Sequence, residues 1–198
     1  MVYVISDIHG CYEKYQELLQ KIAFSEEDEL YVLGDVVDRG PEPMKVLQDM
    51  MLRPNVYPIL GNHDYMALKV LRKMNVEIQE ENAESHLTEK DLLDYMYWTQ
   101  DGGDTTAKGF RRLSKEEKEL DEYHFTDFIL HRAEYGRRYF LDKNTFLVTG
   151  HTPTFLIRED KMPFVYQENG HIAIDCGCVY GERLAAYCLD DGRIIYVE

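Results

Sequence analysis

The stretch LYVLGDVVDRG, residues 30–40, joins four apolar residues to a run of glycine and charged residues. Its apolar part, Leu30–Leu33, has the length and composition of a buried strand. Two other stretches repeat the arrangement, VYVISDIHG at 2–10 and VYPILGNHD at 56–64. In each one a polar cluster follows directly after a predicted strand. Three such clusters at three strand ends indicate a single site.

Helical patterns separate these strands. The apolar residues of each predicted helix recur at helical spacing: Tyr15, Leu18, Leu19 and Ile22 in the first; Met44, Leu47 and Met51 in the second, which is expected to begin at Pro41; and Ala67, Val70, Leu71 and Met74 in the third. Alternating strands and helices predict a parallel-type sheet with helical crossovers.

The middle of the chain, at about 77–125, is more polar and is predicted to be a helical insertion in a single domain that spans 1–198. Thr88 is expected to cap a helix that carries four apolar residues: Leu92, Leu93, Met96 and Tyr97. Ser114 and Glu117 have the spacing of a capping box, which predicts a further helix start.

A fourth strand is predicted at Thr145–Val148, and it too precedes a polar run, TGHTPT at 149–154. The C-terminal part predicts antiparallel strands at Phe164–Tyr166, His171–Asp175, Leu184–Leu189 and Arg193–Val197. Asp190-Asp191-Gly192 joins the last two and is a hairpin sequence.

The four polar clusters are expected to meet at one edge, because sheets with crossovers bind ligands at the carboxyl ends of their strands. Their members are Asp7 and His9; Asp35, Asp38 and Arg39; Asn62 and His63; and His151. One D-x-H or N-H-D alone is more often a turn or cap than a ligand pair. Four clusters at four strand ends favour a functional site.

Aspartate, histidine and asparagine form a ligand set that suits Mn²⁺, Fe or Zn²⁺ and is too rich in nitrogen for Ca²⁺. Asp7 and His9 stand two residues apart, so they can chelate one ion, and Asp35 can bridge two ions. Asn62 and His151 can hold the second. Two metals about 3.5–4 Å apart clamp the oxygens of an in-line phosphoryl displacement and supply hydroxide.

Three further residues complete a phosphoryl-transfer site. Arg39 can hold phosphate oxygens in a fork. His63 can protonate the leaving oxygen, with Asp38 orienting its ring.

Composition bounds the class of protein. The chain has 198 residues and a net charge of −15, which argues against a nucleic-acid or anionic-membrane partner. A phosphorylated substrate is still compatible with this negative charge, because a metal centre makes the electrostatic field positive at the site that it occupies. No pair among the four cysteines has C-x-x-C spacing, and no signal peptide is predicted before the first strand. We therefore expect reduced thiols and a cytoplasmic location.

The motifs SDIHG, GDVVDRG, GNHD and GHTP, in this order, resemble the GDxHG, GDxxDRG, GNH[DE] and GHTP motifs of the calcineurin-like metallophosphoesterases, in their phosphoprotein phosphatase branch. Only the first glycine differs, being Ser6 here. The resemblance spans nearly the whole chain. It is greatest to small bacterial and phage serine/threonine phosphatases and to symmetrical diadenosine tetraphosphatases.

This resemblance implies an α/β (α+β) fold, a two-sheet β-sandwich flanked by helices. It also implies a site that holds two divalent ions, with manganese expected. Asp7, His9 and Asp35 hold the first ion, and Asp35, Asn62 and His151 contribute to the second. The implied general acid is His63, with Asp38 as its partner and Arg39 as a phosphate contact. The phage-type I-W-x-R stretch resembles residues 129–132, which nominates Arg132 as a second phosphate clamp.

One expected ligand is missing from this sequence. Family members take a further histidine from a strand that ends in H-A-G or H-G-G, and no such strand is found between Trp98 and Thr149. The segment of family members that carries this strand is therefore expected to be absent from this chain, near residues 120–125. Its absence would remove part of one sheet. Three alternatives stay open: three protein ligands with added water, substitution by His131 or His124, or a single metal. A homodimer or a swapped element is expected to cover the exposed sheet edges.

The leading interpretation is a metal-dependent phosphoesterase that hydrolyses phosphomonoesters by in-line attack of metal-bound hydroxide. Phosphoserine or phosphothreonine in proteins is the expected substrate. A dinucleoside polyphosphate hydrolase is the enzymatic alternative. A degenerate phosphatase that only binds phosphorylated partners is the third, and only the missing histidine favours it.

Overall fold

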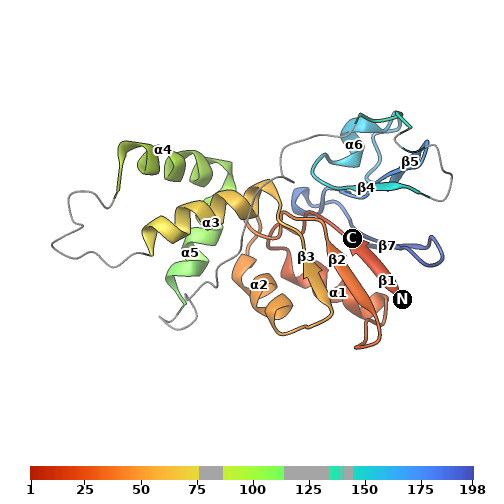
Figure 1. Ribbon diagram of the computed structural model, residues 1–198, viewed down its shortest axis with the longest axis horizontal. Helices are drawn as coiled ribbons and strands as arrows, with labels where there is room; N and C mark the ends of the chain where they lie inside the picture. Colours follow the sequence, from red (N-terminus) through yellow and green to blue (C-terminus); the bar gives the residue numbers. More distant parts are fainter. Residues whose placement is uncertain (76–86, 114–133, 139, 141–144) are drawn as a thin grey trace.

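The computed structural model describes residues 1–75, 87–113, 134–138, 140 and 145–198 (Figure 1). Within these residues the larger sheet has five strands in the order β3-β2-β1-β7-β8. The strands β1 (Val2–Ile5), β2 (Glu29–Val32) and β3 (Val56–Pro58) are parallel, as predicted. The hairpin of β7 (Leu184–Cys188) and β8 (Ile194–Val197) adds antiparallel to β1.

Two helices cross between the parallel strands and cover one face of this sheet: α1 (Tyr12–Lys21) and α2 (Pro43–Met51). The helix α3 (Asn62–Met74) follows β3 and leads away from the sheet (Figure 1). Ile5 of β1 lies in the same buried core as Leu18 of α1, whereas its neighbour Val4 lies in a second core. Successive side chains of the strand point to opposite faces of the sheet, and both faces are therefore apolar.

A smaller sheet packs against the second face. Its three strands, in the order β4-β6-β5, are β4 (Leu147–Thr149), β6 (His171–Ala173) and β5 (Tyr166–Glu168). The short helix α6 (Thr154–Ile157) follows β4. Ile172 of β6 shares a core with Val4 and Ala185 of the larger sheet. The predicted two-sheet arrangement flanked by helices is confirmed.

The second helix begins two residues later than predicted and turns a different face inward. The chain at Pro41 is still in a turn, because the N–H of Glu42 donates to the Gly10 carbonyl at 3.0 Å. Met51, predicted on the buried face, is 82% exposed, while Val46 and Met50 are buried. Met44 and Leu47 only flank the core.

Most strands are also shifted or shortened by one or two residues relative to the sequence predictions. The strand predicted at Phe164–Tyr166 is β5 at Tyr166–Glu168, because the N–H of Val165 donates to the Tyr196 hydroxyl at 3.1 Å instead of to a strand. The predicted strands at 145–148 and 56–60 are Leu147–Thr149 and Val56–Pro58.

The helical part contains α4 (Glu89–Trp98), the kinked segment η1 (Thr99–Gly103) and α5 (Asp104–Arg111). Thr88 caps α4 as predicted, in a reciprocal capping box with Asp91. The four apolar residues predicted on this helix lie at the surface, between 42% and 67% exposed: Leu92, Leu93, Met96 and Tyr97. Its buried anchor is Trp98, 1% exposed.

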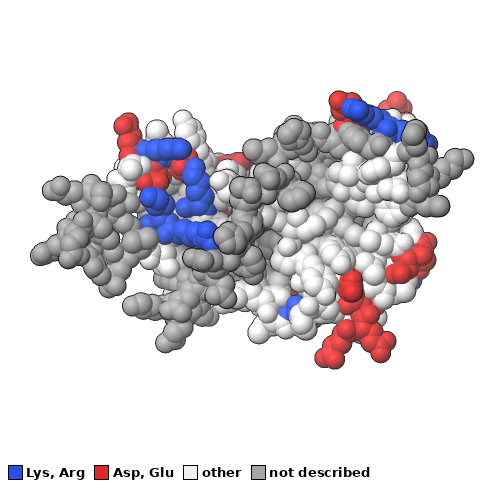
Figure 2. Space-filling view, in the orientation of Figure 1, with Lys and Arg blue, Asp and Glu red and all other residues white. Residues whose placement is uncertain are grey.

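Charged side chains join the helical part together. Figure 2 shows Lys and Arg gathered over this region, and Lys69 of α3 lies 2.6 Å from Asp94 of α4. The predicted capping box at 114–117 lies outside the described residues. No helix in the described part of the chain is long and apolar enough to cross a membrane.

Candidate metal centre

The loops that follow β1 and β2 run side by side and carry most of the predicted site. The N–H of Asp7 donates to the Gly34 carbonyl at 3.2 Å, and the N–H of His9 donates to the Asp35 carbonyl at 2.9 Å. These bonds continue the parallel pairing beyond the last residues of the two strands. The first two polar clusters are therefore held against each other.

Backbone strain is concentrated in the same loops. Within the described residues nine non-glycine residues have a positive φ, and six of these are predicted site residues: Asp7, His9, Asp35, Asp38, Arg39 and His151. Each such residue costs on the order of 1–3 kcal/mol, and such strain clusters at functional sites. The fold retains it because the surrounding hydrogen bonds and packing leave these residues no other conformation.

A close backbone approach explains the glycine that opens GNHD. A Cβ at Gly61 would lie 2.2 Å from Oδ1 of Asp35. Any larger residue would therefore displace Asp35 or the start of α3.

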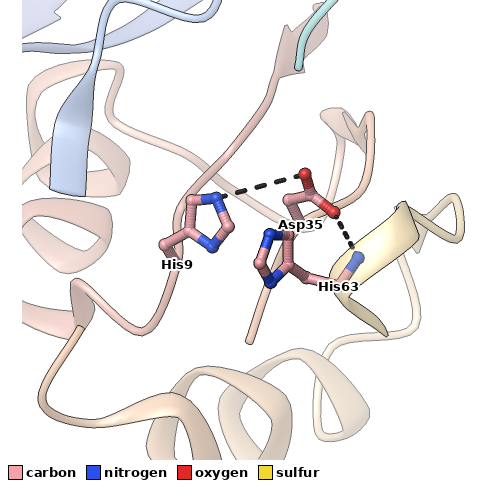
Figure 3. Close-up of side chains that lie close together, drawn as sticks. All are labelled: His9, Asp35 and His63. Atoms are coloured by element: carbon pink, nitrogen blue, oxygen red, sulfur yellow. Dashed lines mark hydrogen bonds and ion pairs between the residues drawn. The ribbon is translucent and has the colours of Figure 1, made fainter. Parts of the chain in front are cut away.

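Asp35 lies to one side of the neighbouring rings of His9 and His63 and contacts both residues (Figure 3). Its Oδ2 is 4.0 Å from Nε2 of His9, and its Oδ1 accepts the backbone N–H of His63 at 3.0 Å. Nδ1 of His9 lies 2.8 Å from the Val37 carbonyl, so Nδ1 carries the proton and Nε2 has a lone pair. Burial lowers the pKa of His9 to about 4, so this ring is neutral at pH 7. Neutral imidazole is the form that binds metal.

Three buried carboxylates surround this point. Burial raises the pKa of Asp7 well above its usual value, and the charges of Asp175 and Asp35 raise it further. Burial also raises the pKa of Asp175 to about 6, with the charge of Asp35 adding to the effect. Asp35 differs, because contacts from His151 and the His63 N–H outweigh burial and lower its pKa.

The donor set fits a divalent transition-metal ion. Ligand atoms of His9, Asp35 and His63 all lie within 4.8 Å of one another. Buried carboxylates are costly without a compensating cation, and nitrogen together with carboxylate oxygen suits Mn²⁺, Fe and Zn²⁺.

A buried hydrogen-bond network fixes the ring of His63. Its Nδ1 lies 2.9 Å from Oδ2 of Asp38. The indole N–H of Trp98 donates to the same oxygen at 2.8 Å, and the Thr106 hydroxyl donates to Oδ1 at 2.6 Å. Asp38 is 0% exposed. The carboxylate therefore orients His63 and leaves Nε2 directed away from it.

Arg39 links the buried ligands to the surface. Its Nη1 lies 3.0 Å from Nε2 of His9, and its Nη2 lies 3.3 Å from Oδ1 of Asp101. The side chain of Arg39 is 28% exposed. A guanidinium at this place can fork onto the oxygens of a phosphoryl group.

The third and fourth clusters meet the first two. Asn62 is the first residue of α3, directly beside His63. The N–H of His151, from the loop after β4, donates to Oδ2 of Asp7 at 2.9 Å. Nδ1 of His151 lies 3.8 Å from Oδ2 of Asp35, and this ring is 43% exposed. The structure thus brings site residues from the loops of both sheets together at one edge of the molecule.

Asp64 has a structural position at the start of α3. Its carboxylate accepts the N–H groups of Gly61 at 3.0 Å, Val36 at 2.9 Å and Val37 at 3.1 Å. These bonds tie the helix start to the loop after β2. Burial raises the pKa of Asp64 to about 6.

Some predictions lie outside the described residues. They concern the second phosphate clamp Arg132, the candidate ligands His124 and His131, and the expected loss of a segment near residues 120–125.

One protein family matches almost the whole chain. Residues 1–197 match the model of the calcineurin-like phosphoesterases. The chain belongs to this family. Its relatives include a symmetrical bis(5'-nucleosyl)-tetraphosphatase of Buchnera aphidicola subsp. Schizaphis graminum, 38% identical over 99 residues, which are 49% of this chain and 36% of the relative. The enzyme of the same name from Cellvibrio japonicus is 44% identical over 78 residues, which are 37% of this chain and 29% of the relative. The match thus covers about a third of the relatives' length.

Solved structures support the calcineurin-like fold. A protein provisionally assigned as a diadenosine tetraphosphatase has a TM-score of 0.56 and 23% identity, and the match covers 99% of this chain and 92% of that chain. A mutant of a cold-active protein tyrosine phosphatase has a TM-score of 0.51 and 20% identity, covering 98% of this chain and 76% of that chain. Identities this low show the fold alone.

Four residues at the site of this calcineurin-like phosphoesterase were not predicted from the sequence: Trp98, Asp101, Thr106 and Asp175. Asp175 had a usable signal, because it is a carboxylate at the end of the predicted strand His171–Asp175; the observed strand β6 ends at Ala173. The other three belong to the helical part, and the paired glycines in TQDGGDTT, residues 99–106, were their only local signal.

Proposed function

We propose that this calcineurin-like phosphoesterase hydrolyses phosphomonoesters with the help of two divalent metal ions, Mn²⁺ being the expected metal. The arrangement of His63 carries the proposal. One ring nitrogen, Nδ1, is held by a fully buried carboxylate, and the ring lies beside His9 and Asp35 with its Nε2 3.6 Å from Asp101. Phosphoester cleavage uses a metal site that activates water and a positioned acid that protonates the leaving group, and a fixed imidazole next to a cation site supplies both.

The ligand assignment is the one predicted from the sequence motifs, and it leaves His63, whose Nδ1 is held by Asp38, to serve as the proton donor. Asp7, His9 and Asp35 would hold one ion, and Asp35, Asn62 and His151 the second. Bound there, the ions would activate water as the nucleophile and neutralise phosphoryl oxygens.

The protein's own residues do the remaining work. Arg39 binds the equatorial phosphoryl oxygens through its fork and so orients phosphorus for in-line attack. Asp38 fixes the Nδ1 side of the ring across the 2.9 Å contact, so Nε2 is the nitrogen presented to the departing group. His63 gives a proton from Nε2 to the oxygen of that group.

The substrate class that we propose first is phosphoserine or phosphothreonine in proteins. A second candidate is a dinucleoside polyphosphate, because relatives 34–44% identical over part of the chain carry the name symmetrical tetraphosphatase. Both classes use the same phosphoryl site and differ only in what lies beyond the scissile bond.

Two monoesters with different leaving groups provide the test. p-Nitrophenolate leaves without protonation, whereas the alkoxide of a phosphoserine peptide needs a proton. His63→Asn should therefore lower kcat on the peptide by about 10²-fold or more, and on p-nitrophenyl phosphate by much less. Turnover should need Mn²⁺ and stop with EDTA.

Met51→Gln is the matched control, because this side chain is 82% exposed and stands at the C-terminal end of α2. It should leave both rates unchanged. Equal losses of kcat on both esters in His63→Asn would show that His63 is not the general acid. A folded wild-type protein that binds Mn²⁺ by calorimetry but turns over neither ester would refute the enzyme and favour a binding protein.

A further inference from the structure

A carboxylate from the helical part stands at the mouth of the site. Asp101 lies in η1, the kinked segment between α4 and α5. Its Oδ1 is 3.3 Å from Nη2 of Arg39, and its Oδ2 is 3.6 Å from Nε2 of His63. The side chain is 53% exposed. Asp101 therefore contacts both the phosphate fork and the proton donor from the solvent side.

The backbone holds Asp101 in this place. The N–H of Arg39 donates to the Gly102 carbonyl at 2.9 Å. Gly102 has a φ of +100°, and a Cβ there would lie 2.6 Å from Cγ of Arg39. Trp98 and Thr106, on either side of η1, both donate to Asp38. The kink is thus fixed to the Asp38–Arg39 loop at several points.

The leaving group must lie near Asp101. His63 can protonate the departing oxygen only when that oxygen is within hydrogen-bond reach of Nε2. Nε2 is itself 3.6 Å from the carboxylate of Asp101. Whatever is bonded to the departing oxygen therefore enters the field of a negative charge.

We propose that Asp101 is a specificity-determining residue that selects substrates by the charge of the leaving group. It disfavours leaving groups that are themselves phosphates, and it favours uncharged hydroxyls and peptides with basic neighbours. The inference rests on the proposed function and separates its two substrate classes, since a polyphosphate would place a second phosphate beside Asp101.

The expected size follows from Coulomb's law. Two charges about 4 Å apart interact strongly in a protein site, but a half-exposed carboxylate is screened by solvent. We expect Asp101 to change the preference between a phosphate and a neutral leaving group by about tenfold. Added salt should reduce this preference, because screening is stronger at high ionic strength.

Asp101 also holds Arg39, so removing its charge will alter phosphoryl binding in general. For that reason the readout is a ratio between two ligands and not a single rate. Asp101→Asn keeps the size of the side chain and removes its charge. Asp104→Asn is the matched control, because that carboxylate is 47% exposed and pairs with Lys108 on α5.

The first measurement is binding, which does not depend on turnover. Calorimetry with Mn²⁺ present gives the Kd of orthophosphate, which fills only the phosphoryl position, and of pyrophosphate, which also reaches the leaving-group position. Asp101→Asn should improve pyrophosphate binding about tenfold more than orthophosphate binding. Equal changes for both anions, or the same ratio change in Asp104→Asn, would overturn the proposal.

The second measurement is kcat/KM for phenyl phosphate and for pyrophosphate. The ratio should favour phenyl phosphate in the wild type and move about tenfold toward pyrophosphate in Asp101→Asn. A constant ratio would contradict the charge selection. Absence of turnover with both substrates would refute the proposed function, and the two Kd values would still decide the role of Asp101.

Discussion

Asp38→Asn tests whether the buried carboxylate orients His63 or merely packs the helical part. The carboxylate accepts three hydrogen bonds: from His63 and Trp98 on one oxygen, and from Thr106 on the other. Asparagine has one acceptor oxygen. If that oxygen replaces Oδ2, the amide N–H₂ faces Thr106, and the threonine hydroxyl loses its acceptor.

The magnitude follows from this count. Losing one buried hydrogen bond to a charged group costs about 1.5–3 kcal/mol. For a chain of this length that corresponds to a Tm lower by roughly 3–12 °C. Replacing the anion with an amide also gives His63 Nδ1 a neutral partner in place of a carboxylate. We expect kcat on a phosphoserine peptide to fall by about 10²-fold or more, within the range of general acid catalysis.

Trp98→Phe separates the two roles. It removes the indole N–H and leaves Asp38 with its bonds to His63 and Thr106. Its Tm should also fall by several degrees, about as much as in Asp38→Asn, but kcat should change by no more than about threefold, because His63 keeps its anionic partner. Thermal unfolding and steady-state kinetics with the same peptide provide both readouts. Equal losses of kcat in the two variants would refute the orienting role of Asp38.

Three more changes have defined outcomes. Gly102→Ala should lose about 1–3 kcal/mol of unfolding free energy in urea, together with most activity. Gly181→Ala is the control, because Gly181 has a φ of +84° and no atom within 4 Å of an added Cβ, so it should lose less stability and keep activity. Similar activities in the two variants would contradict the contact between residue 102 and Arg39. Burial lowers the pKa of His171, so the unfolded chain binds its proton more readily and the free energy of unfolding should fall as pH drops below about 6.5. His171→Gln should flatten that slope in urea titrations at pH 7 and pH 5, and an unchanged slope would count against it. Mn²⁺ should raise the Tm of the wild type, and Asp35→Asn should remove most of the gain; an equal gain would exclude Asp35 as a ligand.

The crossover architecture was predictable because its signals are local. A short apolar run followed by a polar cluster marks both the strand and the edge at which it ends. The register of α2 was not predictable in the same way. Its start is delayed because Glu42 bonds to Gly10, a residue distant in the sequence. That tertiary bond leaves Val46 and Met50 facing the core and Met51 facing solvent.

The same distinction applies to the site. His9 and Asp35 follow strands that pair with each other, so motif spacing alone brought them together. Asp38 and Thr106 stand 68 residues apart, and Asp38 and Trp98 stand 60 apart. No periodicity in the sequence connects them. The partners that the helical part supplies to His63 and Arg39 could therefore be found only in the folded chain.

Strain and charge at this edge have a common explanation. Six predicted site residues have positive φ, and three carboxylates are buried beside one another. Each feature opposes folding when taken alone. A divalent cation would offset the charge, and its binding energy would add to the stability of the fold. Strain alone would serve no purpose in a purely structural turn, since glycine adopts these φ values without steric cost. Aspartate, histidine and arginine stand there because their side chains are needed at that place.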